Sequence, residues 1–371
     1  MRLLAPRADF AYGNARLRAR KASLLGRSDY EALLDKDVDG ILGTLSPTPY
    51  GPEVEDALVR HHGGRRLHEA VRQHLARSLE EMRSFYGTRA RELVDLLLSR
   101  WDLNNAITLL RGEATAPHTG EALAHIFPIG SLSDALAREI SRQNELAAAV
   151  QLLVRWRLPD PETARSLRDA WPDYERTEDF FALEHAVTAG WARRTAEALN
   201  ALEKNGEPLR RFFERELNER NLLVALRLRE ALARGETDRL PILEGHGVYL
   251  PGGSIKLPRI DAAIRFPDDE RVAAALAEAG PEAWREPLER WALGESLQEL
   301  QHDLEARRAR DAVAQFFRGD PLGIDIPVAY AVAKETEARN LRLLGEGAVR
   351  RLHPERVRSR LILFETERQT T

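Results

Sequence analysis

The stretch "LLLSRWDLNNAITLLRGEATA", residues 96–116, decides how the rest of the sequence is interpreted. Its apolar and helix-favouring residues predict a helix, yet Asn104 and Asn105 stand in its middle, just after Asp102. Asparagine is unfavourable inside a helix because its short amide competes with the backbone for hydrogen bonds and favours caps and turns. The pair therefore indicates that these positions serve something other than helix formation.

Two later stretches of the chain align with this one. With Asn105 as the anchor, "WDLNNAITLLR" aligns with "LNERNLLVALR" at Asn221 and with "TEARNLRLLGE" at Asn340. The anchors are 116 and 119 residues apart, which is nearly the same spacing twice. We therefore interpret the three asparagines as marks of an internal threefold repeat, because a long repeat of this kind determines the whole fold.

The surroundings of each anchor repeat as well. The residues 12, 9 and 8 positions earlier are apolar in every copy, the spacing of a buried helical stripe: Leu93, Leu96, Leu97; Leu209, Phe212, Phe213; Val328, Ala331, Val332. Each anchor helix also follows a turn with a glycine and a long amphipathic helix before it: Gly87 after 67–86, Gly206 after 181–203, Gly319 after 293–317. The repeating unit is thus a helical hairpin with smaller helices.

Patterns typical of strands are nearly absent, so the sequence predicts an all-α protein. The repeat divides it into three related helical-bundle modules, which we place at residues 1–116, 117–235 and 236–371. A pseudo-threefold arrangement of these modules would bring the three anchor regions around one axis.

The helix near each anchor carries a group of polar residues that we name the collar. Its candidate members are Arg100, Asp102, Asn105, Glu216, Asn218, Asn221, Glu335, Glu337 and Asn340. Around a threefold axis the collar would line a central opening that receives another protein. The alternative is that each asparagine satisfies a helix end or a neighbouring loop within its own module, since a buried amide requires hydrogen-bond partners.

The composition excludes several classes of function. The chain has 371 residues and no cysteine, which excludes disulfides, thiolate catalysis and cysteine-based zinc or iron–sulfur sites. Its 59 acidic residues exceed its 55 basic ones, which argues against nucleic-acid binding. No apolar window approaches the roughly 18 residues of a membrane-spanning helix, and the N-terminus lacks a secretory signal. We expect a cytoplasmic protein without a membrane span.

No catalytic, cofactor-binding or metal-binding residues are predicted. The chain contains no Gly-Lys pair and hence no phosphate-binding P-loop. His68 and His74 are six residues apart, about 240° around a helix, so they cannot share a metal ion. Asp268 and Asp269 do not continue into the D-D-x-x-D pattern of a magnesium-dependent enzyme acting on diphosphates. After Pro267 they are expected at the start of a helix, where acidic residues stabilise the dipole.

Four stretches together resemble a known family. They are "DFAYGNARLRARKASLL" (9–25), the opening stretch, "YLPGGSIKLPRI" (249–260) and "DPLGIDIPVAYAVAKETEARNLRLL" (320–344). In this order they resemble the C subunit of the prokaryotic V-type or A-type ATPase (ATP synthase), which is similar to the d subunit of the eukaryotic V-ATPase. The resemblance extends from about residue 9 to residue 364.

This resemblance implies a funnel-like, all-α protein without chemistry of its own. Such a protein is monomeric within its complex, sits on the membrane proteolipid ring and holds the D and F subunits of the central stalk. It transmits torque between ATP hydrolysis or synthesis and proton or sodium transport, peripherally on the inner face of the plasma membrane. The alternative function is a generic α-helical scaffold for unrelated partners, although the period of 116–119 residues far exceeds the roughly 34–47 of common helical solenoids.

Overall fold

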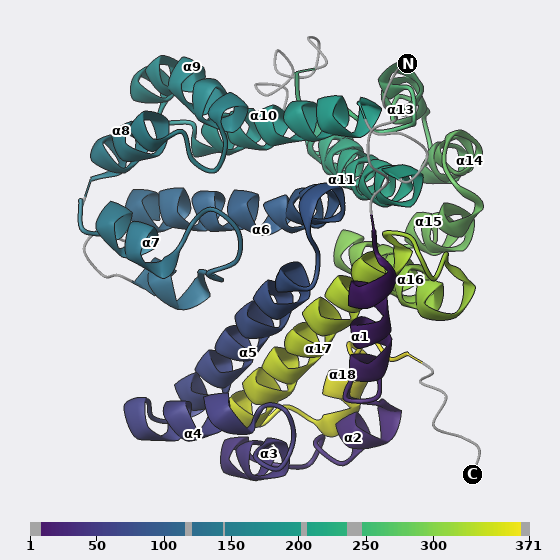
Figure 1. The fold of residues 1–371 in the computed structure, drawn as a ribbon. Helices are drawn as coiled ribbons and strands as arrows, with labels where there is room; N and C mark the ends of the chain where they lie inside the picture. The colour runs from purple at the N-terminus through teal and green to yellow at the C-terminus, as the bar shows by residue number, and fades with distance from the viewer. Residues whose placement is uncertain (1–8, 116–120, 144, 202–205, 236–246, 365–371) are drawn as a thin grey trace, which may run out of the picture. The chain divides into compact units, whose positions relative to one another are not determined.

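A computed structural model describes residues 9–115, 121–143, 145–201, 206–235 and 247–364. Within these segments the chain forms helices joined by turns and contains no strand, which confirms the all-α prediction (Figure 1). The predicted module boundary at 116–117 lies outside the described residues, and the boundary at 235–236 lies at the edge of a segment that is not described.

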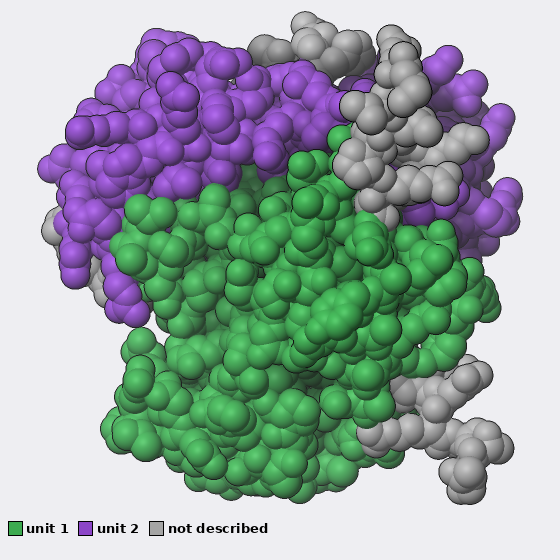
Figure 2. Space-filling view, viewed as in Figure 1, with its two compact units in different colours: residues 1–105, 123–136, 309–371 green, residues 106–122, 137–308 purple. Residues whose placement is uncertain are grey.

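Contacts between residues divide the chain into two compact units (Figure 2). Unit 1 comprises residues 1–105, 123–136 and 309–371, and unit 2 comprises residues 106–122 and 137–308. The three-module division rests on sequence repetition and not on compactness, so it stays a prediction, as does the pseudo-threefold arrangement.

Unit 1 is built around one central helix, α17 (Asp325–Arg350). From Asp325 to Ala338 every residue of α17 except Glu335 is buried, so this part of the helix has neighbours on all sides. Helix α5 (Gly64–Ser84) runs along it (Figure 1). The other helices of the unit are α1 (Ala11–Lys21), α2 (Arg27–Glu31), α3 (Val38–Leu45), α4 (Gly51–Arg60), α18 (Pro354–Arg358), the first part of α6 (Thr88–Thr115) and the last part of α16 (Leu297–Arg318).

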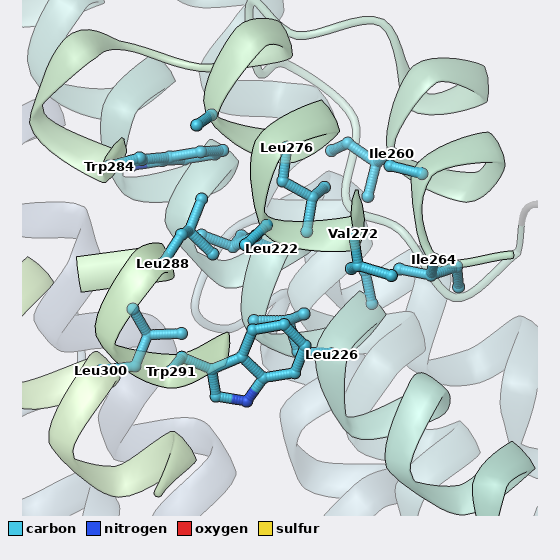
Figure 3. Packing of buried hydrophobic residues seen from close by; sticks show 14 of the residues in the cluster. Leu222, Leu226, Ile260, Ile264, Val272, Leu276, Trp284, Leu288, Trp291 and Leu300 are labelled. Carbon is cyan, nitrogen blue, oxygen red and sulfur yellow. The ribbon is translucent and has the colours of Figure 1, made fainter. Parts of the chain in front are cut away.

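Unit 2 holds the second anchor helix, α11 (Glu207–Ala233). Its other elements are most of α7 (Asp134–Ser141), α8 (Leu146–Trp156), α9 (Pro161–Thr177), α10 (Phe180–Asn200), α13 (Leu257–Ala263), α14 (Asp269–Ala279), η4 (Glu282–Trp284), α15 (Arg285–Ala292), the rest of α6 and α16, and the start of η1 (Glu121–His125). Figure 3 shows one of its apolar clusters, in which Trp284 and Trp291 pack with Leu222 and Leu226 of α11 and Leu276 of α14.

The predicted order of long helix and anchor helix is confirmed three times, as α5–α6, α10–α11 and α16–α17, and residues 202–205 before Gly206 lie outside the described segments. All nine residues of the predicted apolar stripes are buried, with exposed fractions of 8% or less. Apolar periodicity therefore identified these helices and their inward faces correctly.

Helix starts also follow the sequence chemistry. Asp268 is the N-cap of α14, and its Oδ1 accepts a hydrogen bond of 2.8 Å from the backbone N–H of Arg271, as expected for an acidic residue at a helix start. Asp160 and Asp179 cap α9 and α10 in the same way. These caps supply partners for backbone N–H groups that the first turn of a helix leaves unpaired.

Candidate interaction site: the asparagine clamps and the collar

Each anchor asparagine holds the backbone of a loop that follows its helix. Asn105 Nδ2 donates to the carbonyl oxygen of Phe127, and Asn105 Oδ1 accepts from the Phe127 N–H at 2.9 Å. The side-chain amide thus pairs with both backbone groups of one residue, much as a neighbouring strand would. We term this reciprocal pair a clamp.

The same clamp occurs at the other two anchors. Asn221 donates to the Leu250 carbonyl at 2.9 Å and accepts from the Leu250 N–H at 2.7 Å. Asn340 donates to the Ile362 carbonyl at 2.8 Å and accepts from the Ile362 N–H at 3.1 Å. All three asparagines are at most 1% exposed. This recurrence of one hydrogen-bond pattern supports the internal repeat in terms of structure.

The residue three positions before the anchor holds the same loop in the first two copies. Asp102 Oδ1 accepts from the backbone N–H groups of Ser131 and Leu132, at 2.7 and 3.1 Å. Asn218 Oδ1 accepts from the Ile255 N–H at 3.2 Å, and its Nδ2 donates to Ser254 Oγ at 2.9 Å. Each of these two helices therefore binds its loop at two successive points on one face.

Glycine permits this close approach. A Cβ atom on Gly130, whose φ is +88°, would lie 2.5 Å from Asp102 Oδ2. A Cβ atom on Gly253 would lie 2.3 Å from Asn218 Oδ1. Both distances are too short for a real side chain, so the loops reach the collar because glycine stands at these positions.

The third copy differs, because Glu337 binds the N-terminal part of the chain. Its Oε2 accepts from the Leu25 N–H at 2.7 Å, and its Oε1 accepts from the Tyr50 hydroxyl at 2.7 Å and from Lys334. Burial alone would raise the pKa of Glu337, but Lys334 and the hydrogen bonds from Leu25 and Tyr50 outweigh it and lower the pKa. The carboxylate is thus held in its charged form inside unit 1.

Two further collar residues meet across unit 1. Arg100 donates to Glu335 Oε1 at 2.6 Å, and the indole N–H of Trp101 donates to the same oxygen at 3.0 Å. In unit 2, Glu216 accepts from Arg220 one helical turn later, at 2.8 Å. The collar of the first copy is therefore joined to that of the third by an ion pair.

The collar residues engage the chain's own groups. Of the nine candidates, eight are buried and Glu335 is partly exposed. Each asparagine binds a neighbouring loop, as in the alternative interpretation, but only Asn340 does so within its predicted module, because the loops that Asn105 and Asn221 bind lie beyond the predicted boundaries. A direct contact between the collar and another protein stays a prediction.

Arg72 of α5 is a loop-binding residue that the sequence did not reveal. Its Nη1 donates to the Ile126 carbonyl at 2.7 Å, next to the first clamp, while Nε and Nη2 donate to the two oxygens of Glu69 at 3.0 and 2.7 Å. Burial alone would raise the pKa of Glu69, but hydrogen bonds from Arg72 and Gln73 outweigh it and lower the pKa to about 2. The only available signal was the spacing of Glu69 and Arg72 by one helical turn.

We expect Glu69→Gln to remove a pH-dependent part of the stability. A carboxylate with a lowered folded pKa stabilises the fold above its ordinary value of 4.5, and this contribution is lost as the pH falls from 4.5 through about 2. The variant should lose about 1–3 kcal/mol near neutral pH and show a shallower decline between about pH 5 and pH 3. Urea unfolding followed by circular dichroism measures the stability and its pH dependence. Glu80→Gln, on the exposed side of α5, is the control. Equal pH profiles for wild type and Glu69→Gln would contradict the prediction.

The described residues show neither a metal centre nor a membrane span. In these segments no group of three or more histidine, aspartate and glutamate side chains could hold a metal ion. None of the helices assigned there is both long enough and apolar enough to cross a bilayer. The site consists of helices whose buried polar side chains bind the backbone of neighbouring loops.

Comparison with known proteins agrees with this architecture. The family model described as ATP synthase (C/AC39) subunit matches residues 13–360. The chain is 29% identical to the C subunit of the A-type ATP synthase of Halorubrum lacusprofundi, over 95% of this chain and 97% of that protein. It is 28% identical to the C subunit of the V-type ATP synthase of Thermus thermophilus, over 92% of this chain and 94% of that protein, and 27% identical to that of Deinococcus radiodurans, over 91% and 87%. The chain therefore belongs to the ATP synthase (C/AC39) subunit family and is a non-catalytic part of a rotary ATPase.

Proposed function

We propose that this protein is the socket of the rotor. It holds the lower end of the central stalk, formed by the D and F subunits, and sits on the membrane proteolipid ring. In this position it transmits torque between ATP hydrolysis or synthesis and the transport of protons or sodium ions, at the inner face of the plasma membrane. It acts as a single copy within the complex.

The observation that carries this proposal is the threefold recurrence of the clamp. A part that transmits torque must not absorb it by deformation, and a loop tied to a helix through both groups of one residue resists displacement. Each clamp is buried, so water does not compete for its hydrogen bonds. Three such clamps on three long helices supply the stiffness that a coupling part requires.

The collar contributes to this function by positioning. Because eight of its nine residues are buried and bonded within the chain, we propose that the stalk contacts the loops they hold and the partly exposed Glu335. Substitutions in the collar would then weaken stalk binding through displaced loops as well as through lost charge.

Co-purification tests the function directly. A tagged copy of this protein should purify with the detergent-solubilised rotary ATPase, and its gene should lie beside those for the catalytic and proteolipid subunits. A generic scaffold would instead purify with unrelated proteins and lie apart from those genes. The second outcome would overturn the proposal.

We expect the isolated protein to bind the D–F stalk less tightly as salt increases. Ion pairs that are exposed before docking contribute only about 0–1 kcal/mol each and are screened within about 10 Å at 0.1 M salt, so binding through a partly charged surface should weaken. Calorimetric titration at about 0.05 M and about 0.5 M salt measures the Kd. Binding that is unchanged or tighter at high salt would contradict an electrostatic contact.

A further inference from the structure

Unit 1 contains an open groove of about 820 Å³ that no function above uses. Its lining residues come from α2, the last part of α16, α18 and the chain that follows α18. The residues lining it are Arg27, Glu31, Arg310, Val313, Ala314, Phe317, Arg318, Arg358, Leu361, Leu363 and Phe364. None belongs to the collar.

The rim of the groove is strongly positive. Four arginines line it against one glutamate, a formal excess of three positive charges. Glu31 is paired with Arg358 at 2.6 Å, and Arg358 also bonds Glu355 at 2.8 Å. The exposed guanidinium groups of Arg27, Arg310 and Arg318 have no hydrogen bond or ion pair with any residue that the structure describes. Three planar donors are therefore available to an incoming carboxylate.

Apolar side chains make up much of the rest of the lining. We name as the floor the set Val313, Phe317, Leu361, Leu363 and Phe364. The Phe317 side chain is 49% exposed, and Lys21 Nζ lies 3.3 Å from its ring centroid. A large apolar side chain that is half exposed within a lining rich in arginine is characteristic of a binding surface more than of a satisfied one.

We propose that this groove binds an acidic amphipathic helix of a partner protein. Apolar side chains spaced three and four residues apart would contact the floor, while aspartate or glutamate on the flanks of the helix would pair with the arginines. A helix about 10 Å across has a section of about 80 Å², so 820 Å³ corresponds to about two of its turns. This is enough for two or three apolar anchors.

The chain's own ends do not match the groove. Residues 365–371, which follow Phe364, read "ETERQTT" and contain no apolar side chain that could cover the floor. Residues 1–8, "MRLLAPRA", carry two arginines and no acidic residue, so the rim would repel them. Charge complementarity with the arginines favours an acidic segment of a partner protein as the occupant. This inference uses surfaces separate from the collar and does not rest on the socket.

Photo-crosslinking in the assembled complex tests the proposal. Phe317 is replaced by p-benzoylphenylalanine, the complex is irradiated, and the crosslinked peptide is sequenced by mass spectrometry. We expect one segment of another protein of the complex, with apolar residues at helical spacing and flanking acidic residues. Phe181, which is 53% exposed in unit 2, carries the same probe as a control and should not crosslink to that segment.

Charge reversal provides the second measurement. Arg27→Glu with Arg310→Glu should lower the yield of that crosslink at least about tenfold, because two attractive pairs become repulsive. Arg168→Glu with Arg176→Glu, on the exposed face of α9, should leave it unchanged. Crosslinks only to residues 365–371, to lipid, to a second copy or to nothing would overturn the proposal. The socket function is tested separately by co-purification, because that result does not depend on which peptide crosslinks to the probe at position 317.

Discussion

Replacing Asn105 by alanine should destabilise unit 1 by about 2–4 kcal/mol. The substitution leaves the buried N–H of Phe127 without a partner, which costs about 1–3 kcal/mol, and it removes one of the two hydrogen bonds to the Phe127 carbonyl, which keeps the bond from the Ile129 N–H. Since whole domains are stable by only about 5–15 kcal/mol, this loss is a substantial fraction of the total stability. Urea unfolding monitored by circular dichroism measures the change.

The neighbouring residue is a matched control. Asn104 stands on the same helix but is exposed, and alanine there should change the stability by less than about 1.5 kcal/mol, the net value of an ordinary hydrogen bond. Asn340→Ala should behave like Asn105→Ala, because its clamp has the same form. If Asn104→Ala and Asn105→Ala unfolded at the same urea concentration, the clamp would have no energetic role.

Replacing Lys334 by methionine should lower the free energy of unfolding by a similar amount. Lys334 and Glu337 form a buried ion pair, with side chains 5% and 2% exposed. Removing one partner of such a pair leaves an uncompensated charge and typically costs about 3–5 kcal/mol. The double variant Lys334→Met with Glu337→Gln should lose less than Lys334→Met alone, because no unpaired charge then stays buried.

The pH dependence of the stability distinguishes the loss of the ion pair between Lys334 and Glu337 from a simple packing defect. In the wild type the lowered pKa of Glu337 stabilises the fold above the ordinary value of 4.5, and this contribution is lost as the pH falls below it. Without Lys334, burial should raise the pKa, so Lys334→Met should lose less stability than the wild type on acidification. Arg350→Met, which breaks an exposed pair with Glu346 on the same helix, should change the stability by at most about 1 kcal/mol. Parallel pH profiles for wild type and Lys334→Met would refute this account.

The helices and their buried faces could be predicted because the signals are local. Leu93, Leu96 and Leu97 fall on one side of α6 at helical spacing, and the same positions recur before Asn221 and Asn340. Asp268 after a proline similarly predicts the start of α14. In each case the deciding interaction lies within a few residues of the sequence pattern.

The environment of the collar could not be predicted in the same way. A polar residue on a helix has the same sequence signature whether it faces water or a backbone loop, and the clamped residues Phe127, Leu250 and Ile362 follow their anchors by 22, 29 and 22 positions. No periodicity connects a loop residue to a helix over such distances. The pairing of Arg100 with Glu335 and the division into two units likewise depend on long-range contacts.

The bond between Leu25 and Glu337 has a consequence for how the protein is made. These residues are 312 positions apart, and Asn14 donates hydrogen bonds to the carbonyls of Pro321 and Gly323 over almost the same separation. At about 5–20 residues per second a ribosome needs about 15–60 s to synthesise the intervening chain. Throughout that time α1 lacks the contacts that α17 provides in the complete chain. A chain that stops before residue 321 lacks the groups that Asn14 and Leu25 bind, so the first helix completes these contacts only after the C-terminal part of the chain has been made.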